Sequence, residues 1–497
     1  MKSLLLLTSI LLMNSGLHAQ NIRLSQKYTT QTIPGAEFHS YLINDYYYVI
    51  HDKYNMKSRI NRDVQMDVFD NKGEFVSSTG IIDADMNPAG PNMYIGIYPL
   101  KEKMVMFKAD YKKEGEKKFY RLYYYTFSNL THEDNGTLLS SIDADGMSNS
   151  GKYEIATSPD GSKIALISQQ PYIKGMKEKI KVTVFDDSFK QLWTLDYEFP
   201  FDNVKYPTNE VSINNSGNIF ILKNVDNKTE DPYQSLLSLT NNGNKVKQNR
   251  IAMGENNKIA YYKTLFNLQG DLILSGFYVT SKKSGFNLEK PRGTFYMKAG
   301  AADGVVSVTA FTPGTFTMST KLISVNLLEN DQVALTSEEQ LVNSTPIPGQ
   351  AFEYTYKYEN GIIHLIKLNN QGKQEWDYPV KHDISSTDDG GKANSVFTGI
   401  KNGNVCLIYP DKFYKYDGGA QGIILGARAS RQIDAMQVID KEGKMISDTY
   451  IKRLGDSDSK EIVFIYLIPV TGKQQDESSV FFMGCSRDIL YGVKITF

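Results

Sequence analysis

The chain has 497 residues, of which 41% are apolar and 12% aromatic, so it is long enough to bury a large core. Its 55 Lys and Arg residues nearly balance 56 Asp and Glu residues, which excludes a strong overall attraction to nucleic acid or to an anionic membrane. Two cysteines, Cys406 and Cys485, are too few for a disulfide scaffold, and their apolar surroundings favour small buried side chains over a bridge.

The first 19 residues have the pattern of a secretory signal peptide. Lys2 precedes an apolar run from Leu4 to Met13, and Leu17-His18-Ala19 is typical of a cleavage site. A run of about 10 residues is too short for the roughly 20 that span a bilayer, and no later segment approaches that length. The sequence therefore predicts a mature protein of residues 20–497 that is periplasmic or secreted and has no transmembrane segment.

The mature chain repeats two kinds of β-hairpin. The first kind is clearest at Lys152–Gln169, where Pro159 fixes φ, Asp160 can bond its own backbone and Gly161 permits a positive φ in the turn. Hairpins of this kind are predicted at 39–51, 94–109, 152–169, 210–223, 263–278, 322–337, 395–409 and 463–485. Hairpins with an Asx or Gly turn, such as VFDNKGEF and VIDKEGKM, lie between them.

Each interval between hairpins of the first kind holds four strands, which is typical of the blades of a β-propeller. We therefore expect an all-β, single-domain propeller of eight four-stranded blades. The last blade lacks one strand, and the alternating segment Ile22–Tyr28 is predicted to supply its outer strand and close the ring, which removes an open sheet edge. The alternatives are a seven-bladed ring with a separate terminal sandwich, and two smaller propellers.

The run SPDGSKIAL at 158–166 resembles the repeat of TolB-type and related WD-repeat-like bacterial propellers. The hairpins VFDNKGEF and VIDKEGKM are similar to strands of other secreted propeller families. The resemblance implies a propeller fold for most of the chain. It carries over no ligand residues, because a shared fold does not imply a shared function.

One face of such a propeller is expected to carry the functional residues. The turns inside hairpins lie on one face and are tight, whereas the loops between hairpins and between blades lie on the other face. Long loops of this second kind are predicted at 51–63, 108–118, 169–179, 278–293, 338–354 and 409–432. Because function usually lies on long loops of a rigid scaffold, we place the ligand-binding surface there.

These loops combine cations with aromatic residues, a composition that suits anionic ligands, carbohydrates and protein interfaces. The competing interpretation is that the charged side chains are simply solvated. The candidate ligand-binding residues are Tyr111, Lys112, Lys113, Lys117, Lys118, Tyr172, Tyr414, Tyr416 and Arg428.

Acidic connectors precede several of the innermost strands. Asp83, Asp85 and Asn87 have the first three oxygen spacings of a calcium loop. Pro88 stands where the sharp-turn Gly belongs, and Tyr94 where the bidentate Glu belongs. Two interpretations stay open, a calcium site and Asp residues that only start turns. No other cofactor is predicted.

The sequence contains no nucleophile elbow, HExxH helix, phosphate-binding glycine loop or paired cysteine ligands. Its histidines are dispersed, and His39 and His364 are predicted to be packed in strands. The leading hypothesis is a non-enzymatic scaffold that docks a cell-envelope protein or glycan through its long-loop face. The alternative is a hydrolase or lyase that acts on an extracellular polysaccharide or other anionic substrate at the mouth of the central channel, with carboxylates paired across the ring. A third hypothesis is a purely structural secreted protein.

Overall fold

The computed structural model describes residues 21–24, 28–29, 37–54, 62–72, 74–80, 92–128, 131–132, 136–204, 209–225, 233–251, 257–280, 290–348, 354–387, 396–412, 432–451, 466–469, 479–486 and 489–496. Several predictions fall outside these residues. They are the signal peptide, the calcium-loop candidates Asp83, Asp85 and Asn87, and the ligand-binding candidates Tyr414, Tyr416 and Arg428.

The described strands form antiparallel sheets, most of them four-stranded, in which strands that follow one another in the chain are neighbours. The first two sheets contain β3 (Glu37–Ile43), β4 (Tyr46–Tyr54), β5 (Arg62–Asp70) and β6 (Phe75–Gly80), and then β7 (Asn92–Pro99), β8 (Met104–Glu114), β9 (Lys117–Ser128), β10 (Thr131–His132) and β11 (Thr137–Asp143). The next two contain β12 (Lys152–Thr157), β13 (Lys163–Gln169), β14 (Lys177–Asp186) and β15 (Gln191–Asp202), and then β16 (Asn209–Ile213), β17 (Ile219–Val225), β18 (Tyr233–Thr240) and β19 (Lys245–Ile251).

The remaining sheets follow the same plan. They contain β20 (Asn257–Phe266), β21 (Leu272–Thr280), β22 (Gly293–Ala299) and β23 (Val306–Pro313), and then β24 (Thr320–Leu327), β25 (Val333–Pro346), β26 (Tyr354–Leu368) and β27 (Gln374–Thr387). After these come β28 (Phe397–Lys401), β29 (Asn404–Lys412), β30 (Gln432–Ile439) and β31 (Met445–Ile451), and finally β32 (Tyr466–Pro469), β33 (Ser479–Ser486) and β34 (Ile489–Thr496) with β1 (Asn21–Leu24) and β2 (Tyr28–Thr29). In the described part of the chain the only helix is a single 3-10 turn, η1 (Glu329–Asp331), and none has the length and hydrophobicity of a membrane span.

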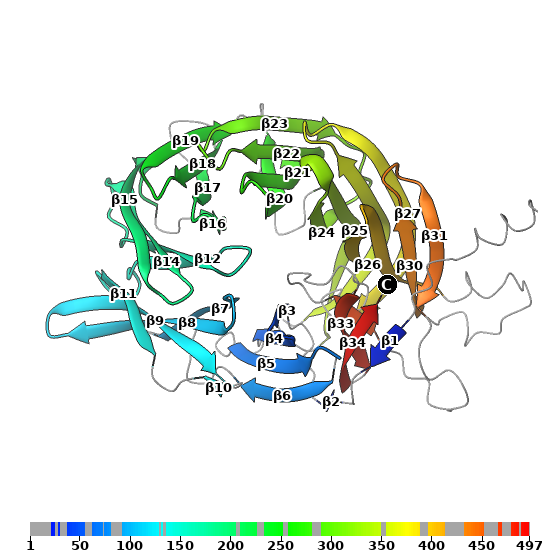
Figure 1. The fold of residues 1–497 in the computed structure, drawn as a ribbon, viewed down its shortest axis with the longest axis horizontal. Helices are drawn as coiled ribbons and strands as arrows, with labels where there is room; N and C mark the ends of the chain where they lie inside the picture. Colours follow the sequence, from blue (N-terminus) through cyan, green and yellow to red (C-terminus); the bar gives the residue numbers. More distant parts are fainter. Residues whose placement is uncertain are drawn as a thin grey trace, which may run out of the picture.

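The sheets are arranged radially around a common centre, with β3, β7, β12, β16, β20 and β24 nearest to it (Figure 1). The protein is therefore an all-β propeller, as the hairpin repeat predicts. A polar residue on an innermost strand can thus lie close to polar residues from other blades, although they are far apart in the sequence.

The two ends of the chain share one sheet. Strand β1 pairs with the last strand β34, from Asn21 opposite Thr496 to Leu24 opposite Val493, and Tyr28 of β2 lies opposite Leu490 (Figure 1). The predicted pairing of the N-terminal segment with the last sheet is confirmed. It covers an edge of β34 that would otherwise expose unpaired backbone groups.

The core lies between neighbouring sheets, because each sheet is covered on both faces. Strand β21, for example, is buried along nearly its whole length, as expected for a strand covered on both faces. Cys406 is buried, which confirms its prediction as a small core residue, whereas the side chain of Cys485 lies outside the described part.

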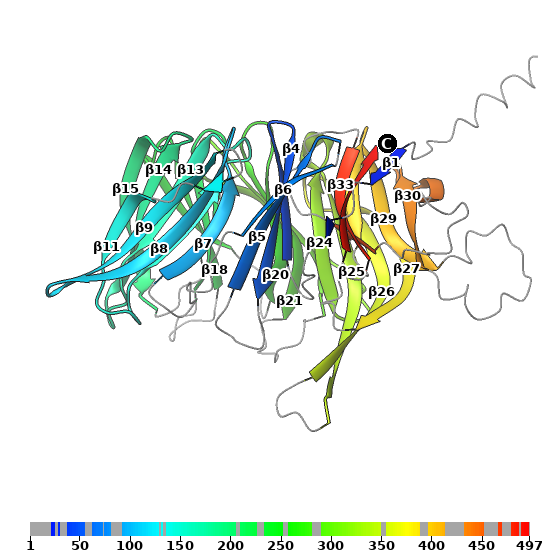
Figure 2. The same ribbon diagram turned by 90° about the horizontal axis from the view of Figure 1, so that it is seen from below.

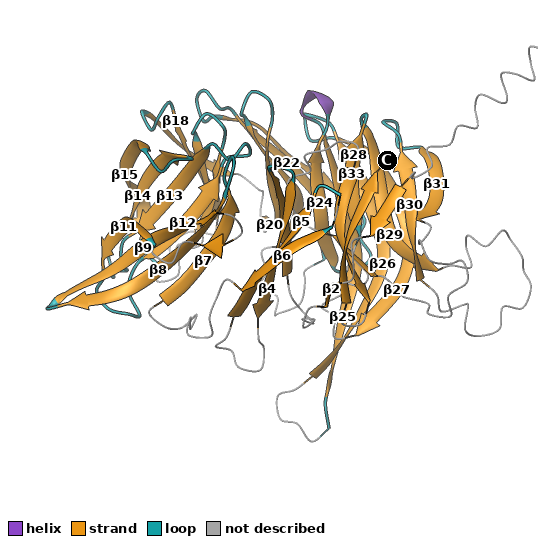
Figure 3. Ribbon diagram, turned by 60° about the horizontal axis from the view of Figure 1, so that its bottom comes forward, coloured by secondary structure: helices purple, strands orange, loops and turns teal. Residues whose placement is uncertain are grey.

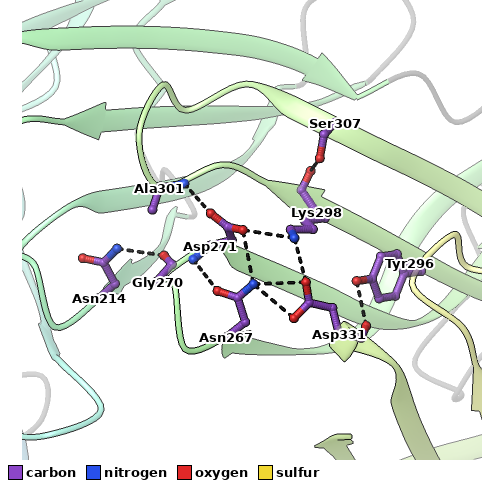
Figure 4. A network of polar contacts seen from close by, with 9 residues as sticks. All are labelled: Asn214, Asn267, Gly270, Asp271, Tyr296, Lys298, Ala301, Ser307 and Asp331. Atoms are coloured by element: carbon purple, nitrogen blue, oxygen red, sulfur yellow. Dashed lines mark hydrogen bonds and ion pairs between the residues drawn. The ribbon is translucent and has the colours of Figure 1, made fainter. Parts of the chain in front are cut away.

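Hydrogen bonds between turns fasten the blades on the tight-turn face. Asn214 Nδ2 donates to the backbone oxygen of Gly270 in the next sheet at 2.8 Å. Asn267 Nδ2 in turn donates to both carboxylate oxygens of Asp331 at 3.1 Å, and Lys298 Nζ lies 2.7 Å from Asp331 Oδ2 (Figure 4). Asx side chains thus do more than form local turns, because they connect one blade to the next.

Two of the predicted long loops are instead extended hairpins. Strands β8 and β9 continue through 108–118 and turn at Gly115, whose φ is 63°. Strands β25 and β26 continue through most of 338–354 and project beyond the disc (Figures 2 and 3). The reason is physical: residues 112–114 of β8 and 341–346 of β25 are exposed, and a strand that projects into solvent on both faces needs no apolar alternation.

Candidate active site

Two Lys–Glu pairs lie where the sheet of β12–β15 meets the sheet of β16–β19. Lys152 and Glu154 stand on the innermost strand β12, which contacts the next innermost strand β16. Glu178 stands near the start of β14, and Lys223 near the end of β17. These strand ends all belong to the face that carries the loops between hairpins, the face where the sequence predicts function.

The pair formed by Lys223 and Glu178 is almost completely removed from solvent. Lys223 Nζ lies 2.6 Å from Glu178 Oε1, and the two side chains are 3% and 0% exposed. The same Nζ donates to Asn209 Oδ1 at 2.9 Å and lies 5.2 Å from the Phe199 ring centroid and 5.5 Å from that of Phe201. A buried cation is costly unless it is paired, so these contacts hold Lys223 in one place.

Burial controls the protonation of this pair. It raises the pKa of Glu178 and lowers the pKa of Lys223, and the attraction between them opposes both shifts without cancelling them. The charge of Glu154 adds to the raised pKa of Glu178. The two carboxylates therefore influence each other electrostatically, an arrangement that is concentrated at functional sites.

The second pair is nearer to solvent. Lys152 Nζ lies 2.5 Å from Glu154 Oε1, and their side chains are 44% and 13% exposed. Within the described residues, Glu154 Oε2, Glu178 Oε2 and Asn209 Nδ2 are buried and have no hydrogen-bond partner. Buried polar atoms are nearly always paired, so several unpaired atoms at one place favour a functional site over a purely structural one.

A cavity of about 240 Å³ opens beside Lys152. It is lined by residues from the entry to β12, the end of β13 and the loop after β15, which are Ser148, Asn149, Ser150, Gly151, Lys152, Gln169, Gln170, Tyr172, Asn203 and Val204. Asn149 fixes one wall, because its side chain accepts from the Tyr172 N–H at 2.8 Å and donates to the Tyr172 carbonyl at 3.0 Å. Tyr172, a predicted ligand-binding residue, thus lies at a cavity.

The other described ligand-binding candidates lie elsewhere. Tyr111, Lys112, Lys113, Lys117 and Lys118 stand on the β8–β9 hairpin of a different sheet, so the structure brings these five together but not with Tyr172. Several charges on this hairpin are already paired. Lys112 Nζ lies 3.2 Å from Asp110, Arg121 lies 2.7 Å from Glu114, and Lys118 Nζ donates to the Asp145 carbonyl at 2.5 Å.

Metal binding finds no support in the described part of the chain, where no three His, Cys, Asp or Glu side chains form a group that could hold an ion. The calcium-loop candidates lie outside it.

The cluster formed by the two Lys–Glu pairs was not predicted from the sequence. Its one visible signal is Lys223, a single charge in the apolar run IFILKNV of β17.

A second buried polar cluster connects β25, β26 and β27. His364 Nδ1 lies 3.3 Å from Asp377 Oδ1, and His364 Nε2 lies 3.6 Å from Glu339 Oε1. Glu339 also accepts the backbone N–H of Thr317 at 2.7 Å. Burial lowers the pKa of His364, but the hydrogen bonds and charges of Asp377 and Glu339 together outweigh burial and leave the pKa raised. His364 is packed in a strand, as the sequence predicts, and we assign this cluster to stability.

Comparisons with known proteins give structural likeness only. No family model matches the chain. No curated protein matches it either. Among solved structures, the chain is similar to the β-propeller domain of the Trilobed protease from Pyrococcus furiosus, with 9% identity, 72% of this chain and 97% of that chain covered, and a TM-score of 0.31. It is also similar to a Bombyx mori β-fructofuranosidase, with 9% identity, 96% and 94% covered, and a TM-score of 0.33.

A third similar structure is an α-L-arabinanase from Penicillium chrysogenum, with 10% identity, 64% of this chain and 94% of that chain covered, and a TM-score of 0.32. Several of the similar structures are named as enzymes that act on carbohydrates, so our leading hypothesis of a non-enzymatic docking scaffold is not upheld, although a likeness this low shows the fold alone. At this level of similarity they assign no role to any residue of this chain. The case for an enzyme is therefore made from the side chains themselves.

Proposed function

We propose that the propeller is an enzyme that cleaves an extracellular polysaccharide, as a hydrolase or lyase, at the face where β12 and β16 begin. The observation that carries this proposal is the cluster of Lys152, Glu154, Glu178 and Lys223 beside a cavity on that face. A concave site with convergent polar groups and shifted pKa values is the usual place for catalysis.

The two carboxylates have different environments, which suits glycosidic chemistry. Enzymes that cleave glycosidic bonds commonly set the protonation of their carboxyl groups by giving them different surroundings. Glu178 is fully buried and has a raised pKa, whereas Glu154 is partly exposed and is paired with Lys152. We assign contact with substrate to Glu154, and to Glu178 and Lys223 the positioning and charge of the site.

The location and the blade number belong to the same proposal. Residues 1–19 have the pattern of a signal peptide and 158–166 resemble secreted propellers, so we place the enzyme outside the cytoplasm. We infer that the ring has eight blades, the last of them built from β32–β34 and completed by β1. The pairing of β1 with β34 supports this number.

The test is turnover on a panel of polysaccharides that includes arabinan, levan, xylan and polygalacturonate. Released reducing ends report either reaction, and ultraviolet absorbance of unsaturated products identifies a lyase. We expect activity on at least one polymer and a fall of about 100-fold or more in Glu154→Gln, because acid–base groups typically contribute 10²–10⁴-fold.

The matched control is Glu198→Gln on β15, where Glu198 Oε2 lies 2.9 Å from Lys179 Nζ and both side chains are about half exposed. This control loses a surface ion pair of the same kind, and its turnover should equal that of the wild type. Equal turnover of Glu154→Gln and wild type would remove Glu154 from the mechanism. No turnover on the whole panel would contradict the proposed enzyme.

A further inference from the structure

The cavity beside Lys152 contains polar atoms that are buried and have no partner. Gln169 lines the cavity and is only 4% exposed. Its Oε1 has no hydrogen-bond partner in the described part of the protein, and the same holds for Oδ1 of Asn203, which also lines the cavity. Leaving such a group unpaired destabilises the protein. A ligand that pairs with both amides would offset this destabilisation.

The walls of the cavity indicate which ligand fits. A side-chain amide presents both an acceptor and a donor, and a hydroxyl group, which also accepts and donates, matches it. Among the described residues that line the cavity, the only cation is Lys152, which is already bound to Glu154 at 2.5 Å. The described lining thus offers amides and a cation that is already paired, which favours a neutral polyhydroxy ligand over an anion.

Exposed apolar side chains accompany the lining residues. Val204 lines the cavity and is exposed, and Met147 and Ile173, exposed at 55% and 60%, are the chain neighbours of the lining residues Ser148 and Tyr172. Exposed apolar side chains near a polar cavity are typical of ligand sites. The C–H face of a sugar ring suits such apolar side chains while its hydroxyl groups reach the amides.

A glycine fixes the shape of the cavity. Gly151 has φ of 87°, and a Cβ placed on it would lie 2.5 Å from the Gln169 carbonyl oxygen. Only glycine therefore allows the entry to β12 to pack this closely against the end of β13. The cavity is a built feature of the backbone, and its volume of about 240 Å³ suits one sugar unit better than an extended chain.

We infer that this cavity is a subsite that binds one neutral sugar unit through Gln169 and Asn203. This subsite rests on the proposed function, because the sugar unit that it binds belongs to the polysaccharide cleaved at Glu154. Gln169 and Asn203 are specificity residues in this account, because they touch a part of the substrate that does not react.

The test measures binding of monosaccharides by saturation-transfer NMR and titration calorimetry, with arabinose, xylose, galactose, glucose and fructose as neutral probes and galacturonate as the anionic probe. At least one neutral sugar should bind the wild-type protein, and galacturonate more weakly. Gln169→Leu should lower the affinity at least tenfold without lowering the melting temperature, because it removes an unpaired buried amide and keeps its shape. Asn203→Ala should also lower the affinity, and Gln191→Leu, on the exposed side of β15, should not change it.

The inference is overturned if no neutral sugar binds, if Gln169→Leu and Asn203→Ala bind like the wild type, or if Gln169→Leu melts well below it, because the amide would then be a structural partner. Its failure is distinguishable from that of the proposed function. Binding that depends on Gln169 in a protein that cleaves no polymer supports the subsite and contradicts the enzyme. Cleavage that depends on Glu154, without sugar binding in the cavity, supports the enzyme and contradicts the subsite.

Discussion

Replacing Gly161 by Ala tests how the tight turns fasten one blade to the next. Gly161 has φ of 70°, and a Cβ placed on it would lie 2.8 Å from backbone atoms of Leu100 and Lys101 in the preceding sheet. Its carbonyl oxygen also accepts the Lys101 N–H at 3.1 Å. The left-handed conformation costs Ala about 1–2 kcal/mol, and loss of the hydrogen bond adds about 0.5–1.5 kcal/mol. We therefore expect Gly161→Ala to lower the free energy of unfolding by about 1.5–3.5 kcal/mol.

The assay is urea unfolding at equilibrium, with Gly175→Ala as the matched control. Gly175 also has a positive φ, 79°, but a Cβ on it would meet no atom within 4 Å. The control should therefore lose only the conformational part, about 1–2 kcal/mol. Equal losses in the two variants would refute the argument, because the contact between the two sheets would then contribute nothing.

Three further predictions concern the contacts between strands and turns. Asp331→Asn keeps a residue that tolerates the φ of 61° but removes the charge that Lys298 binds at 2.7 Å, so urea unfolding should show a loss of about 1–2 kcal/mol, and an unchanged midpoint would contradict the network of Figure 4. The pKa of His364 is raised above 6.5, since burial lowers it but the hydrogen bonds and charges of Asp377 and Glu339 together outweigh burial, so its stabilisation is complete below pH 6.5 and is lost as the pH rises through the folded value. The wild type should therefore lose stability relative to His364→Gln as the pH rises above 6.5, and parallel pH curves would contradict this sign. Deleting residues 21–29 exposes the edge of β34, so thermal melting should show a large loss of stability or aggregation, and normal melting would contradict closure by β1.

Most of the fold could be predicted from the sequence, because the information is local. A turn such as Ser158-Pro159-Asp160-Gly161 specifies a hairpin by its own chemistry, and the structure has strands at every predicted hairpin. The closing strand β1 was predictable because an incomplete last blade leaves an unpaired edge. The extended hairpins β8–β9 and β25–β26 were not predicted because their outer residues are polar or charged, which is typical of loops but is also compatible with strands solvated on both faces.

Less of the candidate site than of the fold could be predicted from the sequence. Glu178 and Lys223 come from different sheets, and nothing local specifies that their side chains meet at 2.6 Å. The same holds for Gln169 and Asn203 at the cavity. Tyr172 was found because it lies on a loop between hairpins, where residues are free to serve function. The lysines of the β8–β9 hairpin stand out by composition, which reports charge but not whether that charge is already paired.

The most direct test of the account is to locate a bound oligosaccharide in crystals of the Glu154→Gln variant, soaked with the polymer fragment that the wild type cleaves. The account predicts a sugar chain at the face where β12 and β16 begin, with the scissile bond next to residue 154 and one unit against Gln169. A sugar bound instead along the β8–β9 hairpin, or no bound sugar under conditions where the wild type turns over, would contradict it.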